Sequence, residues 1–599
     1  MKMPVYRQVS LGRAGVSVER DAQGRFLLRP TQPLGAYPAR LTERLVKWAG
    51  EAPGRTFMAK REGGGEWRHI TYAQALEYAR RLGQALLERG LSADRPLMIL
   101  SENDLEHAML ALAALHVGVP FVSVSPAYSL ISQDFAKLRF CVDLMTPGLV
   151  FASHGTRFAR AIESAVPPGT ELAVTQAPPG RRATLFSELA ATRDTDRVDA
   201  AHASIRPDTV TKFLLTSGST GMSKAVIHTQ RMLTSNLQMI VDCMPFLAEE
   251  PPVLVDWLPW NHTFGGNHNY GLALYNGGTL YIDEGKPVPQ LIGETIRNLR
   301  ELAPTVYFNV PRGFEEIARA LATDRVLAER FFSRVKMLFY AAAGLAQPIW
   351  DALHRVAEDT VGERIVMITG LGMTETAPFA ICANWQAGRS GGIGHPAPGT
   401  EVLLAPVDDK LEARYRGPNV TPGFWRQPEL THDAFDEDGF YRSGDAVKFL
   451  DPADPQKGLV FDGRIAEDFK LDTGTWVSVG PLRAQIIASG APYVQDVVIA
   501  GHDRRELGAL IIPRPGMGEP GHLRRIAQDL LDSLGRETAS SSQRIARAML
   551  LTEPLSIDAG EITDKGSINQ RAVLTARAAL VEELYRNPPS ARVIVPSYS

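Results

Sequence analysis

Cysteine is scarce in this chain of 599 residues, which contains only Cys141, Cys243 and Cys382. The three lie far apart in the sequence, and none belongs to a CxxC pair. A disulfide framework or a zinc knuckle needs paired cysteines, so the sequence predicts neither. Isolated thiols fit a reducing compartment, which indicates a cytoplasmic protein.

Long apolar runs and an excess of one charge are also lacking. The longest apolar stretch, 108–119, is too short and interrupted to span a bilayer, and the beginning, MKMPVYRQVSLGRAG, lacks the apolar core of a signal peptide. The net charge is only −3, so no basic surface for a polyanion is expected. We therefore expect neither a membrane nor a nucleic acid as partner.

The first 200 residues alternate helical and strand-like patterns. Thr71 and Gln74 form a capping-box signature for a helix that Gly90 closes, and a second helical pattern covers 105–117. Short apolar runs at 97–100 and 121–124 surround it, which is typical of crossover units in a largely parallel sheet. Similar runs occur at 213–215, 253–258, 306–310, 337–341 and 365–368.

The pattern of residues changes after Tyr415, from alternating helices and strands to segments rich in turn-forming residues. The turn-rich segments RGPNVTPGFW and DEDGFYRSGD predict short strands and hairpins, and LDPADPQKG predicts a surface loop. Beyond Asp462 we expect a smaller α+β domain, with a helical segment over 572–585 and an extended or disordered tail. At this length more than one hydrophobic core is expected, so the sequence predicts an α/β protein of at least two domains.

The strongest local signal is FLLTSGSTGMSKA, 213–225. An apolar strand runs into a loop rich in Ser, Thr and Gly that ends at Lys224. Glycines let backbone N–H groups approach phosphate oxygens, hydroxyls donate further hydrogen bonds, and lysine adds positive charge. The loop is not a Walker A motif, because Lys224 follows Met222 and Ser223 instead of a glycine. By itself it is compatible with several classes of nucleotide-binding protein.

Five further segments follow in order: LPWNHTFGG (258–266), TGLGMTET (369–376), YRSGD (441–445), FDGRIAEDFKLDTG (461–474) and EITDKGSINQR (561–571). With the loop, they resemble the adenylate-forming superfamily of acyl-CoA synthetases, peptide-synthetase adenylation domains and luciferases. The resemblance covers nearly the whole chain. VSVSPAYSL, DTGTWVSVGPLR and EITDKGSINQRAV are in turn similar to bacterial feruloyl-CoA synthetases.

The resemblance implies ATP, Mg²⁺ and coenzyme A as cofactors. It places Thr374 at the α-phosphate and Glu375, with Thr216, at Mg²⁺, a hard cation suited to oxygen ligands. Asp445 would accept both ribose hydroxyls, and Arg464 would contact ribose and phosphate. The other implied nucleotide-binding residues are Ser217, Gly218, Ser219, Thr220, Gly221 and Lys224 in the phosphate loop, and Gly344, Gly370, Leu371 and Gly372 at the adenine cleft.

His262 is implied to line the acyl pocket beside the carboxylate, although a lone histidine is more often a hydrogen-bonded core residue. The pocket would also include Phe264, Ala341, Ala342, Gly370 and Met373. The implied domains are an N-terminal one, 1–463, with a small β-rich subdomain, and a mobile C-terminal one, 464–599. The latter would supply Lys565 for adenylation, and Gly474 with Lys470 for the thiol step, turning about Ala466.

Three positions depart from the family pattern. Leu371 stands where an aromatic residue commonly stacks on adenine, and Ala466 where the hinge is usually Asp or Lys. Near the C-terminus, Lys565 precedes Gly566, whereas the family motif is usually a Gly-Lys pair.

The residue types agree with acyl-adenylate chemistry. A carboxylate attacks the α-phosphate when Mg²⁺, lysine and backbone donors stabilise the charge that develops, and a thiolate then displaces AMP. No Ser/His/Asp or Cys/His nucleophile is needed. We therefore expect an acid–CoA ligase, a monomer or homodimer, acting on hydroxycinnamates such as ferulate, coumarate or caffeate. The alternatives are a fatty or other aryl acid, with Trp257, Trp260 and Phe264 lining an acyl tunnel, or a non-catalytic nucleotide-binding module.

Overall fold

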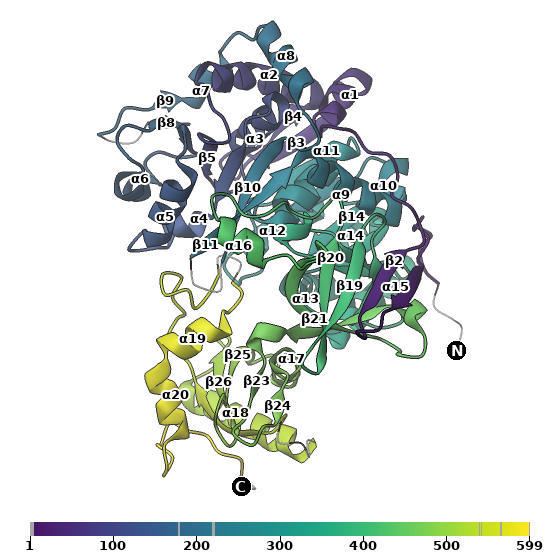
Figure 1. The fold of residues 1–599 in the computed structure, drawn as a ribbon, viewed down its shortest axis with the longest axis vertical. Helices are drawn as coiled ribbons and strands as arrows, with labels where there is room; N and C mark the ends of the chain where they lie inside the picture. Colours follow the sequence, from purple (N-terminus) through teal and green to yellow (C-terminus); the bar gives the residue numbers. More distant parts are fainter. Residues whose placement is uncertain are drawn as a thin grey trace. The chain divides into compact units, whose positions relative to one another are not determined.

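The computed structural model describes residues 5–177, 180–217, 222–537, 540, 542–563 and 566–597 (Figure 1). The chain divides into two compact units. Unit 1 comprises 1–404, 414–442 and 449–460, and unit 2 comprises 405–413, 443–448 and 461–599. The prediction of an α/β protein with layered sheets, a β-rich region and a smaller C-terminal α+β part is confirmed.

A seven-stranded sheet in unit 1 has the order β11-β10-β6-β5-β7-β8-β9. All its pairs are parallel except the β10–β11 hairpin. Every residue of β5, β6 and β7 is buried, as expected of strands covered on both faces. The strands are β5 (Leu97–Leu100), β6 (Phe121–Val124), β7 (Leu149–Ala152), β8 (Glu171–Val174), β9 (Thr184–Leu185), β10 (Val210–Ser217) and β11 (Ser223–Thr229).

The two helices that the sequence predicts in this region are α2 and α3. Thr71 and Gln74 form the expected capping box on α2, and Asp104 caps α3, which ends at the left-handed Gly118. The helices of this region are α1 (Glu43–Glu51), α2 (Tyr72–Glu88), α3 (Leu105–Val117), α4 (Pro126–Leu130), α5 (Ala136–Met145), α6 (Ala159–Ala165), α7 (Phe186–Ala190), α8 (Asp196–Ser204) and α9 (Gln230–Cys243).

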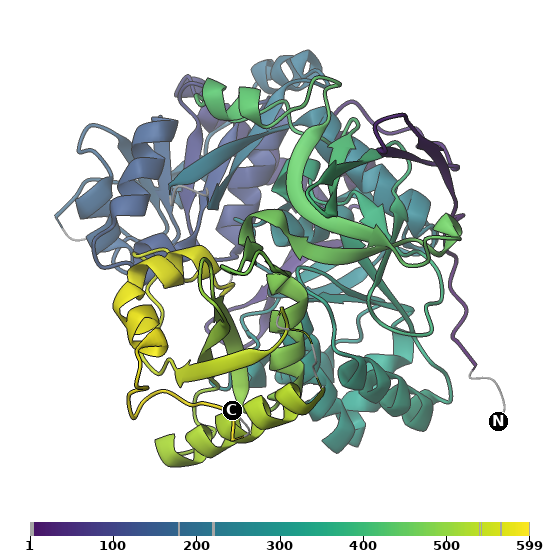
Figure 2. The ribbon, with the colours of Figure 1, turned by 60° about the horizontal axis from the view of Figure 1, so that its bottom comes forward.

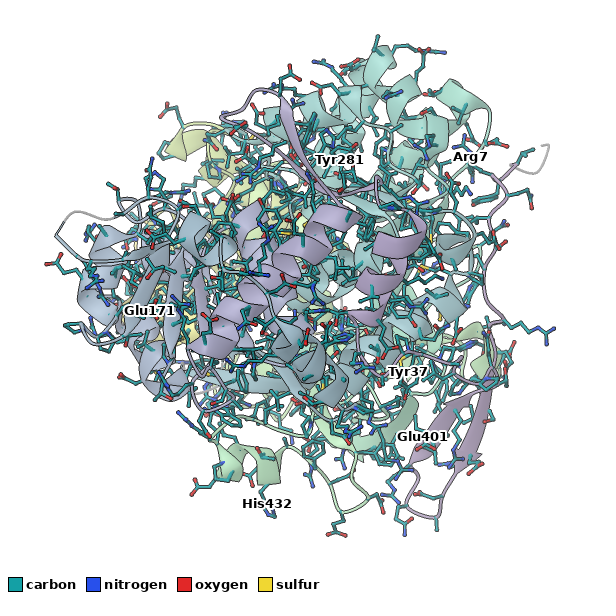
Figure 3. The ribbon with its side chains drawn as sticks, turned by 90° about the horizontal axis from the view of Figure 1, so that it is seen from above. Arg7, Tyr37, Glu171, Tyr281, Glu401 and His432 are labelled. Atoms are coloured by element: carbon teal, nitrogen blue, oxygen red, sulfur yellow. The ribbon has the colours of Figure 1, made fainter. Side chains whose placement is uncertain are left out.

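A four-stranded sheet has the order β12-β13-β3-β4, and an eleven-stranded sheet the order β1-β2-β19-β20-β21-β22-β18-β17-β16-β15-β14. Figure 3 shows Glu401, at the start of β19, beside the β1–β2 hairpin, where Arg29 pairs with it at 2.6 Å. The strands are β1 (Val16–Arg20), β2 (Phe26–Pro30), β3 (Thr56–Arg61), β4 (Trp67–Thr71), β12 (Val253–Asp256), β13 (Thr279–Ile282), β14 (Val306–Asn309), β15 (Met337–Tyr340), β16 (Val366–Leu371), β17 (Ile381–Cys382), β18 (Gly392–Pro396), β19 (Glu401–Val407), β20 (Lys410–Arg416), β21 (Tyr441–Phe449) and β22 (Leu459–Arg464).

The remaining helices before residue 468 include one π-helix, η1 (Phe264–Asn269), which runs directly into α11 (Tyr270–Tyr275). The apolar sides of α13, α14 and α15 share a core with the parallel strands β14, β15 and β16. The other helices are α10 (Phe246–Glu249), α12 (Ile292–Glu301), α13 (Pro311–Thr323), α14 (Arg325–Arg334), α15 (Gln347–Val361), η2 (Thr374–Thr376), α16 (Pro428–Asp433), η3 (Pro455–Lys457) and η4 (Ile465–Glu467).

Unit 2 is built on a three-stranded sheet, β25-β26-β27, with helices on both faces (Figure 2). Alternate residues of β25 belong to different cores, Val497 and Ile499 with α17 and α18, Val498 with α19 and α20. The elements are β23 (Phe469–Lys470), β24 (Trp476–Val477), α17 (Val479–Ser489), β25 (Val494–Ala500), β26 (Leu507–Pro513), α18 (Pro520–Glu537), β27 (Ile545–Leu550), α19 (Gln570–Ala576) and α20 (Ala578–Tyr585).

The C-terminal segment expected to be helical, 572–585, is formed by two helices that meet at Arg577. The Arg577 guanidinium reaches the buried Glu561 carboxylate at 2.6 Å. The tail that follows contains a turn at 591–592, and its Ile594 exchanges backbone hydrogen bonds with Ala548 of β27. Within the described residues, no helix is both long and apolar enough to cross a membrane.

Candidate active site

The β10–β11 hairpin carries the predicted phosphate loop. Thr216 lies opposite Lys224 across the hairpin, so the structure brings these two predicted residues together. The Lys224 ammonium stands 5.1 Å from the centre of the Phe424 ring, which helps to fix its long side chain. Four predicted residues and the Ser217 side chain lie outside the described part: Gly218, Ser219, Thr220 and Gly221.

Thr374 and Glu375 occupy the 3₁₀ turn η2, just beyond β16. Both are buried, 6% and 8% exposed, and the Glu375 carbonyl accepts a hydrogen bond from the Thr421 N–H at 2.8 Å. Glycine is required at position 372, because a Cβ there would stand 1.6 Å from the Pro378 carbonyl oxygen. The turn therefore holds the Glu375 backbone in one position.

Two buried asparagines fix the loop that follows this turn. The Asn236 amide donates to the carbonyls of Thr376 at 3.3 Å and Phe379 at 2.7 Å, and its oxygen accepts from the Phe379 N–H at 3.2 Å. Asn419 donates to the same two carbonyls at 3.1 and 3.0 Å. Sequence motifs did not indicate either asparagine.

His228 on β11 connects three of the predicted segments. Its Nδ1 accepts a hydrogen bond from the Asn267 amide at 3.2 Å, and the same amide also donates to Thr263 at 3.1 Å. Burial lowers the pKa of His228 to about 3, helped by Lys212 and opposed by the Thr374 backbone. The ring is therefore neutral and lies among the phosphate hairpin, the π-helix and η2.

The segment LPWNHTFGG forms a turn and enters the π-helix. A Cβ at Gly265 or Gly266 would stand 2.3 or 2.2 Å from a backbone carbonyl oxygen, so only glycine permits this close approach. His262 and Phe264 are half-buried, and the His262 carbonyl accepts from the Gly266 N–H at 2.7 Å. Single-turn π-helices are frequent at functional sites, where they change the direction of side chains.

Two of the predicted acid-pocket residues lie beside Phe339 of β15, and a third packs against the same hydrophobic cluster. The Phe264 ring centre lies 6.1 Å from that of Phe339, and a Cβ on Gly370 would stand 3.6 Å from the Phe339 ring edge. Ala341 packs against the hydrophobic cluster that contains Phe339. Ala342 is instead exposed, with a left-handed φ of 73°.

The other predicted residues of this region line its partly exposed side. Gly344 is exposed, with open space where a side chain would be. Leu371 is half-buried at the end of β16, where its backbone pairs with Ile381. The Met373 N–H donates to the Thr376 hydroxyl at 2.9 Å.

Lys212 of β10 is buried without having been predicted as a site residue. Its ammonium donates to the Gly266 carbonyl of the π-helix at 3.1 Å and stands 5.3 Å from the Phe121 ring centre. Burial lowers its pKa to about 7. It borders a cavity of about 20 Å³, room for a single water molecule, whose lining includes His107, Ser123, Trp260 and Asn267.

In unit 2, the structure brings Asp445 and Arg464 together. The Arg464 Nε lies 3.3 Å from the Asp445 carboxylate. Asp445 is buried on β21, and its N–H donates to the Ser443 hydroxyl at 3.0 Å, whereas the Arg464 side chain is 60% exposed. The two residues predicted to bind the nucleotide therefore form an ion pair between a buried carboxylate and an exposed guanidinium.

The predicted hinge residue, Ala466, is exposed in the short turn η4. Polar contacts are made instead by Asp468, whose carboxylate pairs with Lys410 and accepts from the Val479 N–H at 2.9 Å. Burial raises the pKa of Asp468, against the opposing effect of Lys410. The same Lys410 ammonium donates to the Asp462 carbonyl at 2.7 Å, so this lysine ties together the residues on both sides of Ala466.

Gly474 lies in the tight turn between β23 and β24. It has a left-handed φ of 79°, open space where a Cβ would be, and an N–H that donates to the Leu471 carbonyl at 2.9 Å. The exposed Lys470 places its ammonium 5.3 Å from the centre of the Trp476 ring. The Thr473 and Thr475 hydroxyls, 2.9 Å apart, are hydrogen bonded across the same turn.

Lys565 lies outside the described residues. The residues on either side of it are hydrogen bonded to each other, the Thr563 N–H to the Ser567 carbonyl at 2.8 Å and the Gly566 N–H to the Thr563 carbonyl at 2.9 Å. Among the described residues, no three His, Cys, Asp or Glu side chains form a cluster suited to a metal ion. Mg²⁺ is commonly held by one or two carboxylates plus substrate phosphates, a role that Glu375 alone could serve.

Two family models match this sequence. The model described as AMP-binding enzyme covers residues 45–425, and the model of the AMP-binding enzyme C-terminal domain covers residues 469–588.

Curated proteins with related sequences include three from different organisms. The probable acyl-activating enzyme 16 of Arabidopsis thaliana is 23% identical over 476 residues, 64% of each chain. A long-chain-fatty-acid–CoA ligase of Mycobacterium tuberculosis is 23% identical over 87% of this chain and 93% of its own. The 3-hydroxybenzoate–CoA ligase of an Aromatoleum species is 24% identical over 78% of this chain and 85% of its own. The chain spans 64% of the length of the first of these relatives. It spans only 33% of the length of two other curated relatives.

Solved structures share the fold. The anthranilate CoA ligase AuaEII, in complex with anthranoyl-AMP, matches 92% of this chain and 99% of its own with a TM-score of 0.72 and 18% identity. ATP-bound MatB from Rhodopseudomonas palustris matches 91% of this chain and 99% of its own with a TM-score of 0.66 and 21% identity.

Proposed function

Because the chain belongs to the AMP-binding enzyme family of the adenylate-forming superfamily, we propose that it is an ATP-dependent acid–CoA ligase. The carboxylate attacks the α-phosphorus of ATP, pyrophosphate leaves, and an acyl-adenylate forms. The CoA thiolate then attacks the acyl carbon, the acyl–oxygen bond breaks, and AMP leaves. The observation that carries the proposal is the family match together with the buried Thr374–Glu375 turn, which follows a parallel strand.

For the first half-reaction, unit 1 supplies the residues that we propose to bind the phosphates of ATP. Thr216 and Lys224 stand opposite each other on the hairpin, where they would contact the phosphates of ATP. Glu375 and Thr216 would hold Mg²⁺, which when bound would neutralise charge on the phosphates. Thr374 would donate to the α-phosphate, and His262 would orient the carboxylate.

Unit 2 supplies the other proposed roles. Asp445 and Arg464 would bind ribose and phosphate, Lys565 would assist adenylation, and Gly474 with Lys470 would serve the thiol step. We place the domain boundary near residue 463, with Ala466 as the pivot and the Lys410–Asp468 pair as the polar contact beside it. A closing domain that assembles each site in turn separates the two half-reactions.

The proposed acids are hydroxycinnamates. The sequence resembles feruloyl-CoA synthetases, and the rings of Phe264 and Phe339 lie on the side of the proposed acid pocket. Aromatic walls favour edge-to-face or offset contact with a phenyl ring, worth about 0.5–1.5 kcal/mol beyond burial. Relatives named for 3-hydroxybenzoate and anthranilate support an aryl acid.

A second candidate is a fatty acid, which the long-chain-fatty-acid–CoA ligase relative supports. A screen of pyrophosphate release over cinnamates, benzoates and fatty acids, with and without CoA, separates the two. We expect ferulate or coumarate to be activated fastest and to give CoA thioesters. Faster turnover of medium-chain fatty acids would reject the hydroxycinnamate assignment, and no acid-dependent pyrophosphate release would reject the ligase function.

A further inference from the structure

His268 places a ring nitrogen inside an aromatic cage. The residue lies in the π-helix η1 and is 1% exposed. Its ring centre stands 4.8–6.3 Å from the centres of four phenylalanine rings contributed by separate segments: Phe264, Phe308, Phe339 and Phe379. A polar ring in such surroundings is costly unless its nitrogens have partners.

The protonation of the ring follows from its neighbours. Burial lowers the pKa of His268 to about 4, so the imidazole is neutral near pH 7. Its Nδ1 lies 2.8 Å from the Asn269 side-chain oxygen, which can only accept a hydrogen bond. The proton is therefore on Nδ1, and Nε2 is an acceptor.

Within the described residues, Nε2 of His268 has no hydrogen-bond partner. Two of the rings around it also border the proposed acid pocket: Phe264 is one of its predicted residues, and Phe339 lies beside the predicted residue Gly370. Phe264 is only half-buried, unlike the other three rings, so the cage is thinnest on that side. The unpartnered Nε2 therefore lies among four aromatic rings, and two of these rings border the proposed acid pocket.

Resting on the acid–CoA ligase function proposed above, we infer that His268 determines substrate specificity, its Nε2 accepting a hydrogen bond from a hydroxyl or amino group at the distal end of an aryl acid. The rings favour an aromatic body, and the acceptor favours a donor at its far end. An acid without a donor leaves the buried nitrogen unpaired, a loss of about tenfold or more in specificity. A fatty acid cannot satisfy it, whereas a phenol can.

The test compares four acids that differ only at the 4-position of cinnamate: hydroxy, amino, methoxy and hydrogen. We expect wild-type kcat/KM in ATP–pyrophosphate exchange to favour the two donors over methoxy and hydrogen by about tenfold or more. In His268→Leu this ratio should fall toward one through loss on the donor acids, with cinnamate itself little changed. His268→Gln, which keeps an acceptor, should retain part of the preference and covers the case that the leucine variant does not fold.

The matched control is His354→Leu. His354 is also buried, also contacts aromatic rings, and also has an unpartnered Nε2 among the described residues, but its ring neighbours are Tyr6 and Trp350. It should leave the donor preference unchanged. A donor preference that survives in His268→Leu, or an equal loss on all four acids, would overturn the inference while the ligase function stands. If wild type activates no acid at all, both fail.

Discussion

The amine of Lys212 is a titratable group buried in the interior of unit 1, where it donates a hydrogen bond to the Gly266 carbonyl. The titratable side chains beside it, His107 and His228, have pKa values of about 4 and about 3 and are neutral near pH 7. With a folded pKa of about 7 against an ordinary 10.5, the folded protein binds fewer protons than the unfolded one between these values. Wild-type stability therefore rises with pH across this window, and the burial penalty is complete below pH 7.

We expect Lys212→Met to stabilise the protein most at low pH. The penalty removed is roughly 5 kcal/mol at pH 6, partly offset by the unpaired Gly266 carbonyl, which costs about 1–3 kcal/mol. The gain in the urea unfolding midpoint should be clear at pH 6 and should shrink strongly by pH 9. The exposed Lys457→Met serves as the control and should show little change at either pH. An equal gain at both pH values would contradict the titration of Lys212.

At this scale the sequence could predict residues within motifs but not residues that act through tertiary contact. Glu375 lies in a motif, whereas Asn236, Asn419 and His228 matter only because the fold brings them to that motif. The cysteines show the same limit. All three are free thiols, as expected, but Cys243 lies close enough to Cys382 to raise the pKa of Cys382 beyond the effect of burial, although 138 residues separate them.

Among the elements, those with strong local signals were predicted best. The capping box at Thr71 and the wholly buried strands of the parallel sheet follow from residues close in sequence. The π-helix could not be predicted, because its shape depends on glycines packed against carbonyls of the preceding turn and on Lys212 from another strand. The break at Arg577 likewise depends on Glu561, sixteen residues earlier.

The η2 loop gives a prediction at the scale of an element. Asn236→Leu removes three hydrogen bonds from α9 to the loop, and although Asn419 keeps both carbonyls paired, the Phe379 N–H is left without this acceptor. This should cost about 1–3 kcal/mol of stability and shift the turn that carries Glu375. We expect acid-dependent ATP–pyrophosphate exchange to fall about tenfold or more.

Asn276→Ala is the control for this variant. Asn276 is also buried, but within the described part of the chain its amide donates only to the Leu272 carbonyl of its own helical segment. Exchange should remain near the wild-type rate in this control. Normal exchange in Asn236→Leu would mean that Asn419 alone suffices to hold the loop.

On the scale of the whole molecule, the chain has two units whose membership is not contiguous. Residues 405–413 and 443–448 group with unit 2, although they precede the predicted boundary at 463. The sequence could indicate a change of residue pattern there. It could not indicate this grouping, because the grouping depends on nonlocal contacts such as Lys410 with Asp468 and Asp445 with Arg464.

If Gly474 serves only the thiol step, as proposed, a substitution there should slow thioester formation and leave adenylation unchanged. A leucine there would meet open space but must adopt a left-handed φ, and its side chain would obstruct a pantetheine arm passing close to the backbone. Gly474→Leu should leave ATP–pyrophosphate exchange nearly intact while thioester formation collapses. Gly516→Leu, at a φ of 77° and also in open space, controls for strain and should spare both reactions. Parallel loss of both in Gly474→Leu would indicate a general structural role.

Lys565 is the proposed adenylation lysine although its motif is shifted. Aligning the apolar residue of the usual Gly-Lys-Ile ending with Ile568 would put Ser567 in the lysine position. Composition argues for Lys565: of 64 Lys and Arg only 13 are lysines, and beyond Arg464 only Lys470 and Lys565 are. A lysine side chain can cover a two-residue offset, roughly 7 Å of extended chain, if the backbone bends.

The role demanded of Lys565 is a positive charge that bridges the acid and the α-phosphate during adenylation and is not needed for thiol transfer. Lys565→Ala should therefore slow ATP–pyrophosphate exchange by on the order of a hundredfold or more, as the loss of one oriented donor does. Thioester formation from synthetic acyl-adenylate and CoA should persist, and Lys457→Ala should affect neither assay. Equal loss in both assays would mean that Lys565 stabilises the fold of its unit. Normal exchange would mean that another group supplies the charge, with Ser567→Ala the next variant to measure.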